Sequence, residues 1–260
     1  MIRYNHAVIE RKWRKRWAEE ENRGPLVAVQ LVPKEAARLD LENGRLVLVS
    51  HFLATILAGE KPQISLLGAA QGWLGDARAL GVAVQDGVGT GRYDLMVLPR
   101  DYARTKHRNV EAALTFLPGR LLETGGVSLG HLLPDFGVDA CRVYVLFLGP
   151  LERDYVFSWH GLASAHRFVA RVWQLAQTGA LSRLEKAGCD GADWSEICDL
   201  RFVVRDRLGQ KKPHTALAAI MGYVRHRSIL TATETRVIAE LLAPFTPFLS
   251  SELLELVATV

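Results

Sequence analysis

The chain has 260 residues, 49% of them apolar, and a formal net charge of +4 at pH 7. This size supports one large domain or two modest ones, each with a buried core. No apolar run reaches the ~18–20 residues that span a membrane, and the N-terminus lacks the apolar stretch of a secretory signal, so we expect a cytoplasmic protein with no membrane partner.

Cysteine and histidine show no metal-binding pattern. Cys141, Cys189 and Cys198 form neither a Cys-x-x-Cys pair nor a disulfide framework. The eight histidines are scattered, without a His-x-x-x-His or His-Glu-x-x-His pair. We therefore expect no metal site, and we interpret the cysteines as ordinary thiols in a reducing compartment.

The first 150 residues alternate between helical and strand patterns. Asn5 is a suitable N-cap for a basic amphipathic helix that should end by Gly24 and Pro25. Strands are expected over residues 26–32, 63–67, 82–84 and 93–98, and helices over residues 44–57, 73–80 and 101–116. Such alternation predicts an α/β domain with a parallel sheet.

Helical periods dominate from residue 161 onward. Asp193 and Thr233 are suitable helix caps, while Pro244 and Pro247 interrupt the pattern. The predicted helices cover residues 162–176, 192–208, 214–229, 233–242 and 250–257. The second half is therefore predicted to be an all-α bundle.

Four stretches are similar to leucyl-tRNA synthetases, and they occur in that family's order. Residues 4–17 resemble the family's first helix, and residues 136–150 resemble the passage from its nucleotide-binding fold into its helical bundle. Residues 38–43, Arg-Leu-Asp-Leu-Glu-Asn, lie where the family has Arg-Leu-His-Met-Gly-His. The fourth stretch, residues 215–221 together with 241–253, looks like the bundle that binds tRNA in this family.

This resemblance implies an α/β Rossmann-like fold, the class I synthetase catalytic fold, followed by an all-α helical bundle. The catalytic fold would be shortened and would lack the family's editing insertion. We expect an N-terminal basic amphipathic helix over residues 1–24, a Rossmann-like core over 25–150 and an anticodon-binding-like bundle over 151–260.

The family's two signature histidines, and the glycine near them, are replaced here. Asp40 and Asn43 take the histidine positions, and Glu42 takes the glycine position. In the family, the histidines stabilise charge on the ATP phosphates, and the glycine lets the adenine ring lie against the backbone. Acidic side chains at these positions would repel ATP.

The family's Lys-Met-Ser-Lys-Ser signature is also missing. Residues 118–126 take its place, with Arg120 as their one cation and Glu123 as an added acid. Because positioned cations stabilise the phosphoryl transition state, these losses predict a truncated, catalytically degenerate paralogue. Such a pseudoenzyme would not activate leucine with ATP, and we expect no cofactor.

Lysine and arginine gather in three sets that are candidate RNA contacts. In the family, the corresponding elements lie along the tRNA, where phosphate contacts are independent of sequence and sensitive to salt. The alternative is that each set is an ordinary solvated face. The candidate residues are Arg11, Lys12, Arg14, Lys15, Arg201, Arg205, Arg207, Lys211, Lys212, Arg225 and Arg227.

The leading hypothesis is a protein that binds tRNA or aminoacyl-tRNA without ATP-dependent amino-acid activation. One alternative is an aminoacyl-tRNA-dependent transferase that forms an ester or amide bond without ATP. Its candidate nucleophile is Ser65, at the end of a predicted strand, where ligands gather in parallel sheets. A second alternative is an accessory or regulatory subunit that docks on a protein partner and binds no RNA.

Overall fold

The computed structural model describes residues 3–18, 24–32, 38–58, 62–70, 72–87, 91–100, 110–122, 127–185 and 194–259. The chain divides into two compact units, each discontinuous in sequence. The helical unit comprises Met1–Ala18, Phe136–Gly149 and Trp159–Val260, and the sheet unit comprises Glu19–Asp135 and Pro150–Ser158. The expected boundaries at residues 25 and 151 stay a prediction.

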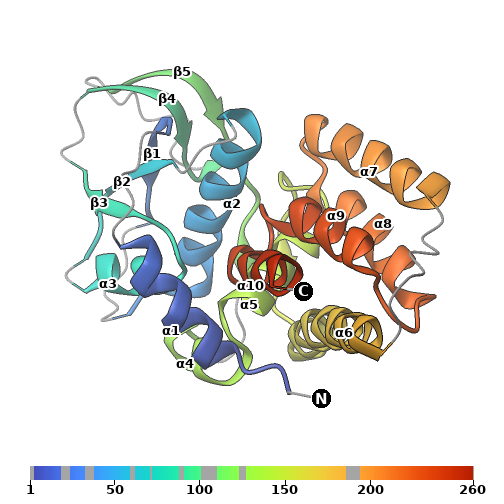
Figure 1. Ribbon diagram of the computed structural model, residues 1–260. Coiled ribbons are helices and arrows are strands. Elements are labelled where there is room, and N and C mark those ends of the chain that lie inside the picture. Colours follow the sequence, from blue (N-terminus) through green and yellow to red (C-terminus); the bar gives the residue numbers. More distant parts are fainter. Residues whose placement is uncertain are drawn as a thin grey trace. The chain divides into compact units, whose positions relative to one another are not determined.

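A five-stranded parallel sheet forms the centre of the sheet unit (Figure 1). The spatial order is β3-β2-β1-β4-β5, so the order reverses between β1 and β4. Open parallel sheets bind ligands at such a switch point, beyond the carboxyl ends of the strands. The strands are β1 (Leu26–Gln30), β2 (Gln63–Leu67), β3 (Val84–Asp86), β4 (Gly91–Val97) and β5 (Val110–Phe116).

Helix α2 (Leu41–Ala58) follows β1 in the described chain and packs against β1 and β4. Every residue from Leu41 to Ser50 is buried, including the polar side chains of Glu42, Asn43 and Arg45. Helix α3 (Trp73–Ala79) packs against β3 and buries Trp73 completely. The alternation of strands and helices confirms the predicted Rossmann-like α/β fold.

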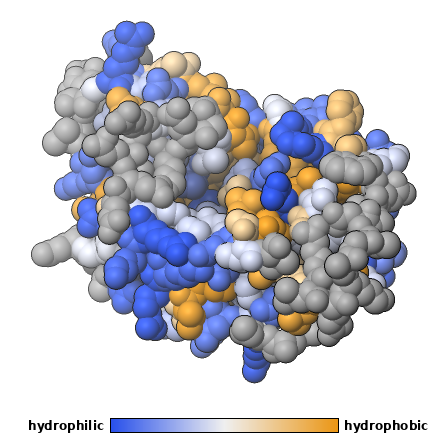
Figure 2. Space-filling view, viewed as in Figure 1, coloured by the Kyte–Doolittle hydropathy of each residue, from blue (hydrophilic) through white to orange (hydrophobic). Residues whose placement is uncertain are grey.

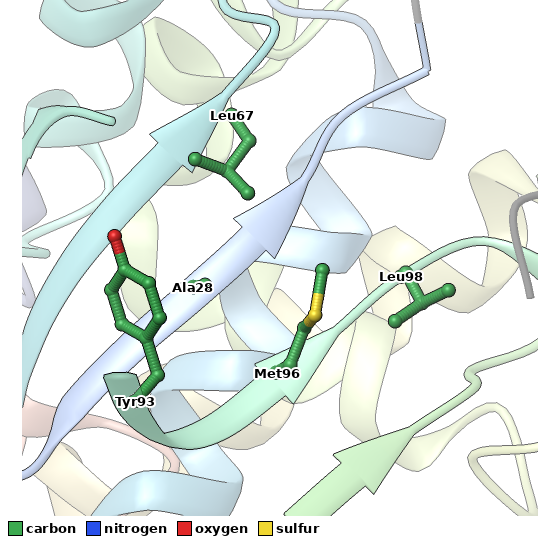
Figure 3. Close-up of a cluster of buried hydrophobic side chains, with 5 residues drawn as sticks. All are labelled: Ala28, Leu67, Tyr93, Met96 and Leu98. Carbon is green, nitrogen blue, oxygen red and sulfur yellow. The ribbon is translucent and has the colours of Figure 1, made fainter. Parts of the chain in front are cut away.

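A second apolar layer lies on the sheet (Figure 3). Three neighbouring strands contribute to it, because successive residues of a strand point to opposite faces. Its members are Ala28, Leu67, Tyr93, Met96 and Leu98. The alternate residues Val27, Val29, Leu95 and Val97 are buried as well, so the sheet carries buried side chains on both of its faces, as a doubly covered parallel sheet requires.

The helix predicted over residues 101–116 is wrong for its second half, which forms the edge strand β5. Glu111, Ala113 and Thr115 are exposed, whereas Ala112 and Leu114 are half-buried. This alternation has the period of a strand, and pairing with β4 overrides the helical tendency of the two alanines. The first half of the predicted helix lies outside the described residues.

A small parallel pair, β6 (Leu121–Leu122) with β7 (Tyr155–Val156), completes the sheet unit. Gly119 precedes β6 and donates its N–H to the carbonyl of Leu151 at 2.8 Å. A Cβ at Gly119 would lie 1.9 Å from the carbonyl oxygen of Arg153. Only glycine therefore permits this close approach, which fixes the chain that carries Arg120.

The helical unit confirms the predicted all-α region. Helix α5 packs against α6, α8 and α10, and α10 packs against α9, α6 and α1. Thr231, rather than the predicted Thr233, caps α9 through a capping box with Glu234, and Asp193 lies outside the described residues. The described helices of this unit are α1 (His6–Trp17), α5 (Val138–Phe147), α6 (Trp159–Glu185), α7 (Trp194–Gly209), α8 (Pro213–Arg225), α9 (Ala232–Leu242) and α10 (Pro247–Ala258), and α4 (Leu129–Phe136) leads into it.

Buried polar groups join three of these helices. The Asp139 carboxylate accepts hydrogen bonds from the backbone N–H of Leu249 at 2.6 Å and of Phe248 at 3.4 Å, at the N-terminus of α10. Arg142 donates to the carbonyl of Phe245 at 3.1 Å. Glu10 of α1 accepts from the backbone N–H of Val138 at 2.6 Å. These contacts fix α1 and α10 on α5.

No helix within the described ranges is long and apolar enough to span a membrane.

Candidate functional site

The sheet's switch point lies beside the N-terminus of α2, where the sequence predicts the altered nucleotide signature. Asp40 caps this helix: its Oδ1 accepts the backbone N–H of Asn43 at 2.7 Å, and its carbonyl accepts the N–H of Gly44 at 2.9 Å. A carboxylate suits this position because it satisfies a free N–H and faces the positive end of the helix dipole. The cap therefore places a negative charge where this fold commonly binds phosphate.

Asn43 is completely buried and bonds the backbone that follows β1. Its Oδ1 accepts the N–H of Val32 at 2.7 Å, and its Nδ2 donates to the carbonyl of Val32 at 3.1 Å. Both ends of the amide are thus engaged inside the protein. Asn43 acts here as a connector between β1 and α2.

Glu42 and Arg120, 78 residues apart, form a two-point ion pair. Arg120 Nε lies 2.5 Å from Glu42 Oε1, and Arg120 Nη2 lies 3.4 Å from Oε2. The Glu42 side chain is only 7% exposed, whereas that of Arg120 is 46% exposed. The backbone N–H of Arg120 also donates to Asp154 Oδ1 at 2.7 Å. The two stretches compared with the family's signatures in the sequence analysis are therefore in direct contact.

Arg38 and Asp76 form a second ion pair at this end of the sheet unit. Arg38 Nη2 lies 2.7 Å from Asp76 Oδ1, and its Nε donates to Oδ2 at 3.0 Å. The same Oδ2 accepts the backbone N–H of Leu39 at 2.8 Å. Asp76 was not predicted as a site residue from the sequence, although an acid in the first turn of a predicted helix is a usable signal.

Three arginines of this region each lie against a carboxylate: Arg38 against Asp76, Arg100 against Asp154 and Arg120 against Glu42. A fourth, Arg45 of α2, is buried and donates to the backbone carbonyls of Leu151 and Arg153. Glu123, the remaining predicted signature residue, lies outside the described residues.

Ser65 lies in the middle of β2, not at its end as predicted. It is buried, and Gln85 Nε2 lies 3.1 Å from its hydroxyl oxygen. An amide cannot take up the proton of a serine, so this partner does not activate a nucleophile. A cavity of about 250 Å³ at β2 and β3 is lined by Gln63, Ile64, Ala83, Val84 and Gln85, without Ser65. The role of Ser65 stays a prediction.

Helix α1 places part of its basic set against α10. Lys12 Nζ lies 2.7 Å from Glu252 Oε2 and also pairs with Glu255. Arg14 pairs with Glu10 of its own helix at 3.0 Å. Figure 2 shows a hydrophilic band over α1. Arg11 and Lys15 of this helix are exposed. RNA contact by the α1 set stays a prediction, and half of that set has carboxylate partners.

The other two basic sets share one helical hairpin, α7 and α8. Arg201 pairs with Glu240 at 3.1 Å, and Arg227 pairs with Glu196 at 2.6 Å and Glu234 at 3.4 Å. The Arg227 guanidinium also lies over the Tyr223 ring at 4.3 Å. Arg227 therefore contributes to packing as well as to charge.

The remaining cations of the hairpin are more available. Arg207 lies 3.9 Å from Asp206, and Lys212 donates to Gln210 at 2.8 Å. Among the described residues, Arg205, Lys211 and Arg225 have no ion-pair partner. Residues 194–229 hold seven Lys or Arg and three Asp or Glu, a balance of +4 that equals that of the whole chain.

Within the described ranges, no three His, Cys, Asp or Glu side chains gather as a metal site would require.

Comparison with known proteins gives a partial similarity to leucine–tRNA ligase. No family model matches the chain. A leucine–tRNA ligase of Chlorobium phaeobacteroides (strain BS1) is 32% identical over 132 residues, which cover 48% of this chain and 16% of that ligase. The chain thus spans a small part of the length of this relative.

Two solved structures are also similar. The agnB2 LeuRS of Agrobacterium radiobacter K84, in a ternary complex with tRNA and LeuAMS, aligns with a TM-score of 0.48 and 16% identity, covering 64% of this chain and 27% of that one. Methionyl-tRNA synthetase of Mycobacterium tuberculosis with methionyl-adenylate aligns with a TM-score of 0.49 and 18% identity, covering 63% and 44%. The fold class itself follows from the strand order and parallel register.

Proposed function

We propose that this chain is a leucyl-tRNA synthetase paralogue that binds tRNA or aminoacyl-tRNA and does not activate an amino acid with ATP. The observation that carries the proposal is the Glu42–Arg120 ion pair. The pair connects the two stretches that would hold ATP in a synthetase. Because each side chain is bound to the other, neither is available to ATP. Transfer at phosphorus needs cations free to stabilise developing charge.

The two acids at the start of α2 support the same conclusion. Asp40 and Glu42 are both buried within the first turn of the helix or next to it. A triphosphate placed there would meet two carboxylates at short range, and such repulsion is strong where water is excluded. The N-terminus of α2 therefore already has carboxylates of the protein beside it, in the position where a phosphate would bind.

RNA binding is supported by the excess of cations on the α7–α8 hairpin, together with the partial similarity to a tRNA ligase. Arg205, Lys211 and Arg225 would contact phosphates, releasing counterions. The transferase alternative is less favoured, because Ser65 is buried against an amide. No contact in the described chain specifically favours the accessory-subunit alternative.

The test is tRNA binding measured over a salt series with the full chain. We expect log K to fall linearly with log salt, with a slope of about −0.7 to −0.9 for each phosphate contacted. Replacing Arg205 and Arg225 with glutamine should weaken binding and flatten the slope by about 1 for each arginine. Arg92→Gln, at an exposed cation of β4, is the matched control and should leave the slope unchanged. Absence of binding at low salt would refute the RNA part of the proposal.

A further inference from the structure

Phe202 lies on α7, and within the described ranges its side chain is mostly exposed. Its side chain is 75% exposed, the highest value among the large apolar residues of the described chain. Ile197, Leu200 and Val204 are buried and attach α7 to its neighbours, so the helix is already fixed by its other face. Within the described ranges, the Phe202 ring contacts no other aromatic ring.

Exposure alone identifies no site. Apolar residues reach the viewed surface at several separate places (Figure 2), and single exposed apolar side chains are common in proteins. The charges around Phe202 are the second observation.

Arg205 lies one turn after Phe202, and residues three apart share a helix face. Arg205 is exposed and has no ion-pair partner in the described chain, while Arg201, on the same flank, pairs with Glu240. Arg225 is the last residue of α8, two residues before Arg227. Arg227 pairs with Glu196, so this segment lies near the start of α7. Cations therefore lie beside the ring and toward the start of the helix.

Lys211 adds a cation beyond the other end of α7, whose last residue, Gly209, lies about 10 Å along the axis from Phe202 at ~1.5 Å per residue. The chain reverses there in a Schellman motif: Lys212 N–H bonds the Arg207 carbonyl, and Lys211 N–H bonds the Leu208 carbonyl, both at 2.9 Å. Lys211 has φ of +57° in this motif, where glycine is usual. A lysine occupies a position that conformational preference assigns to glycine.

Two acids also flank the ring. The Asp206 carboxylate accepts a hydrogen bond from Gln210 Nε2 at 2.8 Å and lies 3.9 Å from Arg207, so its negative charge is partly neutralised. Asp199 lies one turn before Phe202, on the flank away from Arg205, and is exposed. The cation next to the ring is therefore Arg205, on the flank of α7 opposite Asp199.

Resting on the proposed function, we infer that Phe202 is a stacking platform for an unpaired RNA base, with Arg205, Lys211 and Arg225 contacting neighbouring phosphates. Bases of any sequence stack on an aromatic ring, and cations beside the ring follow the backbone. A single-stranded region of RNA satisfies both features, whereas a neutral protein surface would satisfy only the ring. The balance of +4 over residues 194–229 favours RNA as the occupant.

The experiment compares Phe202→Leu, Phe202→Ala and Phe202→Trp in the full chain. The probes are an oligoadenylate of about 12 nucleotides, a length within the site sizes of stacking proteins, and a duplex RNA of equal length. Loss of one stacked base should weaken oligoadenylate binding about 5- to 150-fold in the leucine and alanine variants. The tryptophan variant should bind at least as tightly as the wild type, and the salt slope should stay constant for all three. Duplex binding should change little.

The outcomes separate this inference from the proposed function. If the wild type binds tRNA and the leucine variant binds oligoadenylate as the wild type does, the stacking role is refuted while RNA binding stands. If the alanine variant keeps its RNA affinity but loses a copurifying protein, Phe202 belongs to a protein interface instead. If the wild type binds no RNA, both proposals fail.

Discussion

The buried carboxylate of Asp139 should make the stability of the helical unit depend on pH. Burial away from water raises the pKa of Asp139 to about 7, from an ordinary value of 3.8, despite the hydrogen bond from the Leu249 N–H. Because the folded-state pKa is the higher one, the contribution of this group is fully present below pH ~4 and is lost as pH rises through 7. A difference of about three units corresponds to a loss of about 4 kcal/mol.

The perturbation is Asp139→Asn, which keeps an acceptor for the Leu249 N–H and cannot ionise. The unfolding free energy of the wild type, from urea titrations at pH 5 to 8.5, should decline by about 3 kcal/mol, and the variant should lose most of this slope. Asp135→Asn, the same change at an exposed aspartate, is the control and should keep the wild-type slope. An unchanged slope in Asp139→Asn would refute the reasoning.

The other predictions concern the Glu42–Arg120 pair and the α7–α8 turn. Arg120→Ala leaves the buried Glu42 carboxylate without its cation and should lower the unfolding free energy by about 1–3 kcal/mol, less than for a fully buried pair because Arg120 is 46% exposed. Adding Glu42→Gln should restore part of that loss, and additive losses in urea unfolding would contradict a direct pairing. Lys211→Gly relieves a left-handed backbone at φ of +57° and should raise stability by about 1 kcal/mol. The same variant should reduce the salt slope of RNA binding by about 1, and an unchanged slope would remove Lys211 from the RNA surface.

Local patterns in the sequence predicted most of the fold. The N-cap at Asn5, the strands around Val29 and Ile64, and the long helices of the second half all depend on nearby residues, and the structure confirms them. The strand β5 was missed because Glu111–Phe116 also suits a helix, and its partner β4 decides the outcome. Long-range pairing of this kind leaves little trace in a short window.

The contacts of the candidate site could not be predicted from the sequence. Asp40, Glu42 and Asn43 were visible in the sequence as departures from the pattern of the family that it resembles. Their new bonds were not, since Glu42 pairs with Arg120 across 78 residues and Asn43 bonds the backbone of Val32. Tertiary packing alone brings such groups together.

The basic sets show the same limit. A run of cations on a helix has the same pattern whether it faces water, RNA or another helix. On α1, Lys12 faces the acids of α10, Glu252 and Glu255. On α7, Arg201 faces Glu240 of α9. The carboxylates that neutralise these residues lie far along the chain, so the sequence could not separate paired cations from available ones.

Leucine-dependent exchange between ATP and pyrophosphate tests the central claim most directly. The full chain, with magnesium, leucine and tRNA present, should give no exchange above the buffer background, because Arg120 is paired with Glu42 and Asp40 caps the N-terminus of α2. Leucine-dependent exchange by the wild-type chain would contradict the account, and its loss in Arg120→Ala would show that Arg120 serves ATP.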